Sequence, residues 1–144
     1  MSSACRRIAA ILCGLCMSVA ARAAADIVVI ASANSPLSRL TSDQAADIFL
    51  GKAASLPNVG KITPVDQVEG SAVRQEFYRK AANKTAAQLT AYWSRQIFTG
   101  KGEPPAAVGD TEAVKRLVAS NPSTIGYIPK SAVDASVKPL LTIP

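Results

Sequence analysis

Residues 61–74 have the sequence Lys-Ile-Thr-Pro-Val-Asp-Gln-Val-Glu-Gly-Ser-Ala-Val-Arg, which predicts a strand, a short loop and then the start of a helix. The apolar part ends at Val65, and Gly70 and Ser71 stand before the helix. A helix start presents unpaired backbone N–H groups and the positive end of the helix dipole, which together suit an oxyanion. Gly70 lets the backbone approach a ligand closely, and Ser71 adds a hydroxyl.

The charges in this segment leave two interpretations open. Arg74 falls in the first helical turn, where the dipole disfavours a cation, so we expect a negative group beside it. Asp66 or Glu69 can supply that charge, and Ser71 is then an ordinary helix cap. The segment lacks the lysine and spacing of a P-loop and the second glycine of the Gly-x-Ser-x-Gly motif. It therefore predicts either an oxyanion site or a purely structural turn.

The flanking sequence predicts the other elements. The unbroken apolar run 27–31 is typical of a strand covered on both faces, as in a parallel sheet, and Pro64 indicates an edge or an irregularity in the strand at 61–65. The Gly- and Pro-rich segment 100–109 is expected to be a loop. Helix caps are expected at Thr41, Ser71, Thr85 and Asp110, and further strands at 125–128 and 137–143.

The resulting order, β-α-β-α-α-α-β-β with long crossovers, predicts one α/β domain with a mixed, partly parallel sheet flanked by helices. Ligands of such folds lie outside the carboxyl ends of strands. Ser32 and Asn34 follow the first strand, so we expect them to line the same crevice as Ser71. Ordinary turn chemistry is the alternative explanation for both residues. Tyr92 and Trp93 lie on an apolar helical stripe and are expected in the core.

Residues 1–25 have the parts of a secretory signal peptide. Arg6 and Arg7 precede an uncharged, mostly apolar run at 8–20, and small residues at alternate positions follow. That run is shorter than the roughly 20 apolar residues that span a bilayer. We expect cleavage after Ala25, with Ala23 as the alternative site, and a mature domain of residues 26–144 in the periplasm. A buried N-terminal helix is the competing interpretation.

Composition excludes several classes of protein. The chain has 144 residues, 49% hydrophobic and 18% charged, which argues against disorder, and it has no His, the commonest general base and metal ligand. Its three cysteines all lie within residues 1–25. We therefore expect no enzyme activity, no catalytic residue, no metal and no cofactor. Scattered basic residues and the absence of another long apolar run predict no nucleic-acid binding and no membrane insertion after signal cleavage.

Six segments of the sequence together suggest a relationship to a known family: 26–29, 40–51, 65–77, 92–100, 121–122 and 125–127. Their motifs resemble, in the same order, those of phosphate ABC-transporter substrate-binding proteins, and most of all the short single-lobe branch of that family. This resemblance implies a single-lobe type 2 periplasmic-binding-protein-like domain. In the family, phosphate is held between two lobes by helix-terminal amides and hydroxyls.

The family's oxyanion motif is roughly Arg-Ser-x-Gly-Ser-Gly-Thr, and Gly70 and Ser71 match its first Gly-Ser pair. Its second glycine and its threonine are replaced by Ala72 and Val73, and its arginine is missing or replaced by Arg74. The resemblance thus implies that an oxyanion is bound by residues of this segment, with the polar residues after the first strand beside them. The expected ligand-binding residues are Gly70, Ser71, Ala72, Arg74, Asp66, Gln67, Ser32 and Asn34.

From these observations we expect a periplasmic solute-binding-like protein that recognises phosphate or a similar oxyanion and is associated with ABC-type phosphate uptake. The alternative is a non-enzymatic interaction or sensory module that kept the fold and lost the ligand. Residues 26–144 suffice for about one lobe. Tight binding would therefore need a second surface from a transporter, a sensor, a second lobe or a dimer mate.

Overall fold

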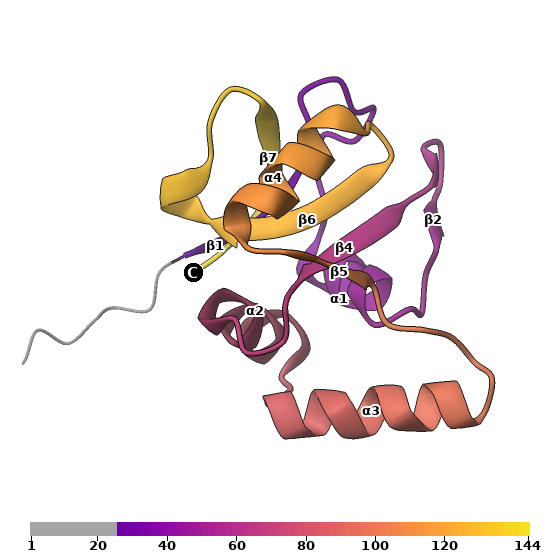
Figure 1. Cartoon of the computed structure of the whole chain (residues 1–144). Helices are drawn as coiled ribbons and strands as arrows, with labels where there is room; N and C mark the ends of the chain where they lie inside the picture. Colours follow the sequence, from indigo (N-terminus) through magenta and orange to yellow (C-terminus); the bar gives the residue numbers. More distant parts are fainter. Residues whose placement is uncertain (1–25) are drawn as a thin grey trace, which may run out of the picture.

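The computed structural model describes residues 26–144, and the predicted signal peptide lies outside the described residues. A five-stranded sheet in the order β5-β4-β6-β1-β7 forms the centre of the domain (Figure 1). A two-stranded hairpin of β2 and β3 lies beside it. The strands are β1 (Ile27–Ser32), β2 (Ser55–Leu56), β3 (Gly60–Lys61), β4 (Thr63–Gln67), β5 (Ala106–Gly109), β6 (Thr124–Pro129) and β7 (Val137–Ile143).

The four α-helices within residues 26–144 begin directly after the residues predicted to cap them. Thr41 and Thr85 form complete capping boxes with Gln44 and Gln88, and the hydroxyl of Ser71 accepts a hydrogen bond from the backbone of its own helix. These local hydrogen bonds explain why the sequence predicts the helix starts closely. The helices are α1 (Ser42–Phe49), α2 (Ala72–Ala82), α3 (Ala86–Phe98) and α4 (Thr111–Ser120), and a 3₁₀ turn, η1, spans Lys130–Ala132.

The sheet is mixed, as the sequence predicts, because β4 runs parallel to β5 and β6 whereas β1 runs antiparallel to β6 and β7. The expectation that β1 belongs to the parallel part is wrong. All six residues of β1 are buried because other parts of the chain cover both faces of the sheet at this strand. Such coverage is also possible for an antiparallel strand, so burial alone does not determine the direction of a strand. As a result, β1 and β4 end at opposite ends of the sheet.

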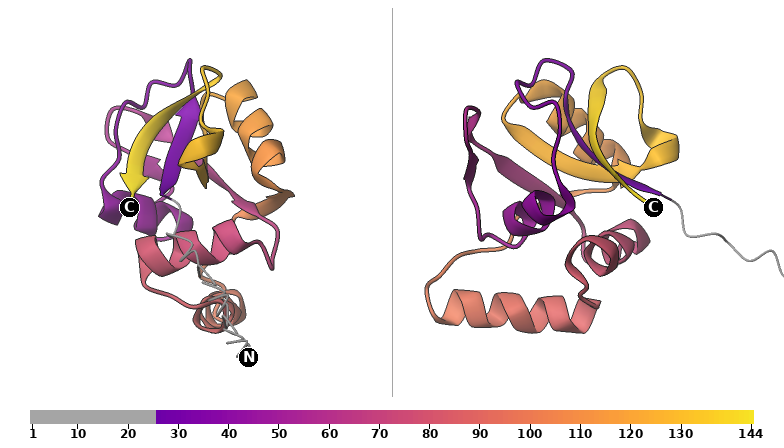
Figure 2. Two further views of the ribbon diagram at one scale, coloured as in Figure 1. Left: turned by 90° about the vertical axis from the view of Figure 1, so that its left-hand side faces the viewer. Right: turned by 180° about the vertical axis from the view of Figure 1, so that it is seen from behind.

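Alternate residues of β1 enter two separate cores. Val29 packs on one face with Phe49 of α1 and Phe77 of α2, whereas Val28 packs on the other face with Val114 of α4. Figure 2 shows α4 on one side of the sheet and α1 and α2 on the other. This three-layer arrangement confirms a sheet flanked by helices.

Helix α3 lies outside α1 and α2, at the bottom of Figure 1. Tyr92 donates a hydrogen bond to the carbonyl of Leu50 at 2.7 Å, and the buried Trp93 ring lies against Gly51. The backbone of Gly51 has φ of 73°, a conformation that favours glycine. Tyr92 and Trp93 therefore hold α3 to the end of α1. Trp93 lies in the core as expected, whereas Tyr92 is only partly buried and packs against it.

Two short elements differ from the sequence-based expectations. Strand β5 lies within the segment predicted to be a loop, and the β2–β3 hairpin was not predicted. Both are short and largely exposed, so they carry no burial pattern that a sequence could reveal. Pro64 of β4 pairs only with β6, because the pairing with β5 starts at Val65. Its missing N–H therefore costs no sheet hydrogen bond.

Candidate functional site

Two helices start side by side at the carboxyl ends of β4 and β5. Each strand leads through a glycine with positive φ, 89° at Gly70 and 137° at Gly109, into a capped helix. The backbone N–H of Val68 donates to the carbonyl of Gly109 at 3.0 Å and joins the two connections. The starts of α2 and α4 thus lie next to each other at the carboxyl ends of two parallel strands, where ligand sites of α/β folds are expected.

A buried carboxylate anchors the base of this region. Asp66 is 2% exposed, and its oxygens accept hydrogen bonds from four donors. Tyr78 Oη donates to Oδ2 at 2.8 Å, Arg74 Nε donates to Oδ2 at 3.4 Å, and the Gln67 backbone donates to Oδ1 at 2.8 Å. The fourth donor is Tyr127 Oη, which bonds to Oδ1. Asp66 is the negative group that the position of Arg74 predicts.

These bonds define the chemistry of the cluster. Burial, followed by the neighbouring charge of Asp66, raises the pKa of both Tyr78 and Tyr127 far above the ordinary value of 10.0. Both hydroxyls therefore remain donors at neutral pH. The expectation that Asp66 contacts a ligand is wrong, because the carboxylate is buried and does not line the open space between the two helix starts. Its place in the site is to orient Arg74.

Ser71 and Gln67 connect the strand end to both helices. Ser71 Oγ accepts from the Arg74 backbone at 3.2 Å and donates to Gln67 Oε1 at 2.8 Å. The amide of Gln67 donates to Thr111 Oγ1 at 3.2 Å and to the Tyr127 carbonyl at 3.3 Å. Gln67 is 2% exposed, so it holds the two helix starts together and presents only a small part of its surface to the space between them. Ser71 is half-buried and remains within reach of the solvent side.

An open hollow of about 660 Å³ lies between the two helix starts. The first backbone amides of α2, those of Ala72 and Val73, have no partner within the helix. Ala72 is exposed, and Val73 lines the hollow. The residues that line the hollow are Gln67, Val68, Glu69, Gly70, Ser71, Val73, Asp110, Thr111 and Glu112.

The two helix starts differ in charge. Helix α4 is capped by Asp110 and carries Glu112 in its first turn, so its positive dipole end is already compensated. Helix α2 has no acidic residue in its first turn and carries Arg74 there instead. An anion is therefore favoured at α2 rather than at α4. Glu69 also lines the hollow, and these three carboxylates oppose tight anion binding.

Ser32 and Asn34 do not share this region. Ala31, near the end of β1, pairs with Ile125, and Ile125 in turn pairs with Pro64 near the start of β4. The hydroxyl of Ser32 donates to the carbonyl of Ala119 at 3.1 Å, at the far end of α4. The prediction that Ser32 and Asn34 line the same crevice as Ser71 is wrong. The cause is the antiparallel direction of β1, and turn chemistry explains the Ser32 hydroxyl, which accepts from the Asn34 backbone.

Sequence reasoning missed four residues that organise the site. Tyr78 and Tyr127 hold Asp66, and Asp110 and Thr111 supply the second helix start. The segment Gly-Asp-Thr at 109–111 contained a signal, since it repeats the order of glycine, cap and first helical residue seen in Gly-Ser-Ala at 70–72. The tyrosines carried no such signal, because they reach Asp66 only through the tertiary fold.

No protein-family model matches this chain, and no curated protein does. Solved structures do match, each over 81% of the chain. A phosphate ABC-transporter substrate-binding protein of Clostridium perfringens, solved with bound phosphate, is 29% identical with a TM-score of 0.63. An ABC-type phosphate transport receptor of Vibrio cholerae is 24% identical with a TM-score of 0.64, and PstS of Borrelia burgdorferi is 17% identical with a TM-score of 0.59.

These matches define a class of fold. The chain has the α/β fold of about one lobe of PstS-like periplasmic binding proteins, and the resemblance stated from the sequence is confirmed at that level. It spans only 45% to 47% of the three matched chains. The matched proteins are described as binding proteins and receptors rather than enzymes. Among residues 26–144, no helix is long and apolar enough to cross a membrane.

Proposed function

We propose that this chain is a periplasmic solute-binding-like protein that recognises phosphate or a similar oxyanion at the start of α2. The observation that carries the proposal is a helix start with no acidic residue in its first turn, where Gly70, Ser71 and Val73 line an open hollow. The amides of Ala72 and Val73 at this start have no partner within the helix. The likeness to a structure solved with bound phosphate supports the same ligand class. Residues 1–25, as a signal peptide, would bring the domain to the periplasm.

Each candidate residue has a distinct part in this proposal. Gly70 leaves open space at the helix start, since no heavy atom lies within 4 Å of where a Cβ would stand. Ser71 keeps the first turn in place through the Arg74 backbone. Arg74 is not among the residues that line the hollow. Its guanidinium has five N–H donors, so the bond from Nε to Asp66 leaves donors for an anion bound at the helix start.

The expected affinity is low. Two or three charge-assisted hydrogen bonds of about 1.5–3 kcal/mol each must offset association costs of about 4 kcal/mol or more. The three carboxylates around the hollow reduce the net gain further. A Kd on the order of 1 mM is therefore expected for one copy of the chain. A second lobe, a transporter or a sensor would have to supply further contacts for tighter binding, as expected of a component of ABC-type phosphate uptake.

The test is calorimetry and thermal unfolding with inorganic phosphate, sulfate and chloride, on protein purified from the periplasm after expression of the full sequence. Phosphate should raise the melting temperature at millimolar concentration. Arg74→Gln and Ser71→Ala should each abolish that rise, whereas Arg116→Gln, an exposed arginine on α4, should preserve it. Micromolar phosphate binding by a monomer would contradict the proposal that one copy forms only a half-site. Separately, the mass of the purified protein tests the predicted signal-peptide cleavage after Ala25.

A second candidate is a non-enzymatic interaction or sensory module that kept the fold and lost the ligand. The observation in its favour is that the polar side chains of the region already have hydrogen-bond partners within the protein. Ser71 donates to Gln67, and Asp66 accepts from the two tyrosines. Under this alternative, none of the anions changes the melting temperature of the unmutated protein beyond the effect of ionic strength. The same titration therefore separates the two candidates.

A further inference from the structure

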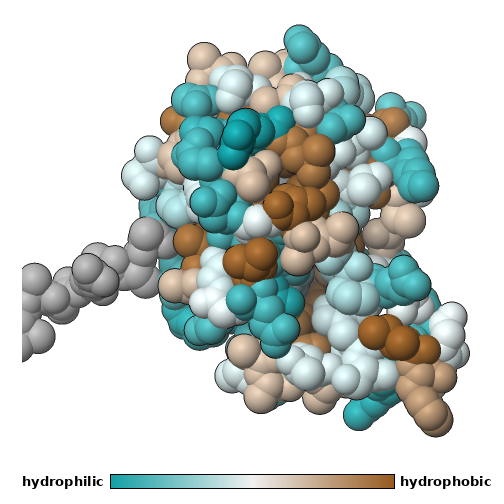
Figure 3. Space-filling model, viewed as in Figure 1, coloured by the Kyte–Doolittle hydropathy of each residue, from teal (hydrophilic) through white to brown (hydrophobic). Residues whose placement is uncertain are grey.

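The end of α3 presents an aromatic side chain to solvent. Phe98 is 92% exposed and Ile97 is 56% exposed, although the same helix buries Leu89 and Trp93. Figure 3 shows the resulting apolar surface at the lower right, where α3 ends. A fully buried aromatic side chain removes about 150–250 Å² from water, so an exposed one at a helix end is a strong candidate for an interface.

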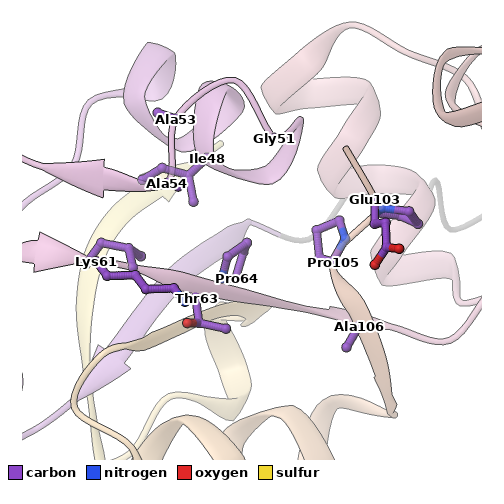
Figure 4. A pocket seen from close by; sticks show the side chains of 12 residues that line it. Ile48, Gly51, Ala53, Ala54, Lys61, Thr63, Pro64, Glu103, Pro105 and Ala106 are labelled. Carbon is purple, nitrogen blue, oxygen red and sulfur yellow. The ribbon is translucent and has the colours of Figure 1, made fainter. Parts of the chain in front are cut away.

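An apolar pocket of about 470 Å³ lies next to the same loop. The loop after Phe98 supplies Pro104 and Pro105 to its wall, and α1, β4 and the segment before β4 supply Ile48, Pro64 and Ile62. Figure 4 shows the pocket open between α1, β4 and this loop. Its volume falls within the range of about 300–1,000 Å³ that holds small organic groups, so it can admit one aromatic side chain.

The rim of this pocket carries two opposite charges. Lys61 lies on one side and Glu103 on the other (Figure 4). Both side chains are exposed, and within residues 26–144 no ion pair involves either of them. A two-fold axis between this rim and the end of α3 would turn each pocket toward the α3 end of the other copy and bring Lys61 of each copy toward Glu103 of the other. A single patch with this property is complementary to itself.

We propose that a second copy of this chain docks here as an isologous dimer, with Phe98 of each copy in the apolar pocket of the other. The two insertions are flanked by two Lys61–Glu103 pairs. This surface lies at the start of β4, whereas the start of α2 follows its end, roughly 16 Å away for a five-residue strand. The dimer therefore leaves the proposed oxyanion site open and is independent of it.

The test is sedimentation equilibrium over a range of concentrations, on the protein recovered from the periplasm. The unmutated chain should dimerise in a concentration-dependent manner, and Phe98→Ser should weaken the dimer by about 30-fold, as expected of a central aromatic anchor. Val68→Ser is the matched control, because Val68 is a 46% exposed apolar residue at the other end of β4. It should leave the dimer unchanged.

The charge pairs give a test that does not depend on Phe98. Lys61→Glu and Glu103→Lys should each weaken the dimer, because each places like charges opposite one another twice. The double variant should restore it, since the opposite pairs are then re-formed. Protein that remains monomeric up to roughly 1 mM would overturn the proposal. A dimer that survives Phe98→Ser, or one that the double variant fails to restore, would do so as well.

Discussion

Asp66 illustrates how far a single residue can be understood from its neighbours in sequence. The position of Arg74 in a first helical turn predicts a negative partner, and Asp66, eight residues earlier, is that partner. The two tyrosines that complete its hydrogen bonds lie 12 and 61 residues further along. Their approach depends on α2 packing on the face of the sheet to which the Tyr127 side chain of β6 points, which no local pattern encodes. The sequence therefore predicted the pair but not the burial that removes Asp66 from ligand contact.

Removal of the Asp66 carboxylate should be costly. Asp66→Ala leaves the hydroxyls of Tyr78 and Tyr127 and the Arg74 guanidinium without their buried acceptor, and it should lower the free energy of unfolding by about 3–5 kcal/mol. Urea denaturation measures this loss. Asp26→Ala is the control, because the Asp26–Lys130 pair is exposed and 4.0 Å apart, and it should cost less than about 1 kcal/mol. Equal effects of the two substitutions would contradict the description of the cluster.

The same cluster predicts instability at alkaline pH. Burial and Asp66 raise the pKa of Tyr78 and Tyr127 in the folded state, whereas both tyrosines ionise near pH 10.0 when unfolded. Below that pH both states are protonated and the stability is fully present. Above it the unfolded state alone loses protons, so the free energy of unfolding should fall as the pH rises, by up to about 1.4 kcal/mol per pH unit for each tyrosine.

Urea denaturation from neutral pH to above about pH 10 tests this dependence. Tyr127→Phe should make the slope above the ordinary tyrosine pKa clearly shallower, because one of the two strongly shifted groups is lost, whereas Tyr78 and the less buried Tyr92 keep their raised pKa. Tyrosinate absorbance of the folded protein provides an independent measurement, since Tyr78 and Tyr127 should not ionise before the chain unfolds. Early ionisation of both residues in folded protein would show that their hydroxyls are not held as described.

At the scale of whole elements, local signals predicted helices better than strands. Each helix cap acts through bonds within three residues, so Thr41 or Thr85 needs nothing distant to be recognised. Strand β1 was predicted from its burial, but its direction depends on β6 and β7, far along the chain. Strand β5 is short and exposed. The misplacement of Ser32 and Asn34 follows directly from the direction of β1.

The contact between β6 and α4 allows a test of element packing. A Cβ at Gly126 would meet Val114 Cγ1 at 2.5 Å and Val118 Cγ2 at 3.2 Å, and both valines are fully buried. Gly126→Ala should therefore push α4 away from the sheet and cost about 1–3 kcal/mol in the free energy of unfolding. Gly102→Ala, where nothing lies within 4 Å, is the control and should have little effect. A neutral Gly126→Ala would mean that this layer is loosely packed.

At the scale of the whole molecule, the chain presents one lobe of a fold that its solved relatives extend to about twice the length. Its two proposed surfaces lie at opposite ends of β4. The start of α2 is an open half-site at which we expect weak anion binding. The surface around Phe98 is where we expect a second copy of the chain to bind. Because the surfaces are separate, phosphate should not change the dimer equilibrium, and Phe98→Ser should not change the response to phosphate.

Anion binding at the start of α2 is tested by a phosphate titration of isotopically labelled protein followed through its amide resonances. We expect saturable shifts at millimolar phosphate, centred on the backbone amides of Ala72 and Val73, which sulfate reproduces in part and chloride does not. The Arg74→Gln variant should lose these shifts while its other resonances remain in place. Resonances at the start of α2 that stay fixed at saturating phosphate, or shifts confined to another surface, would contradict anion binding there.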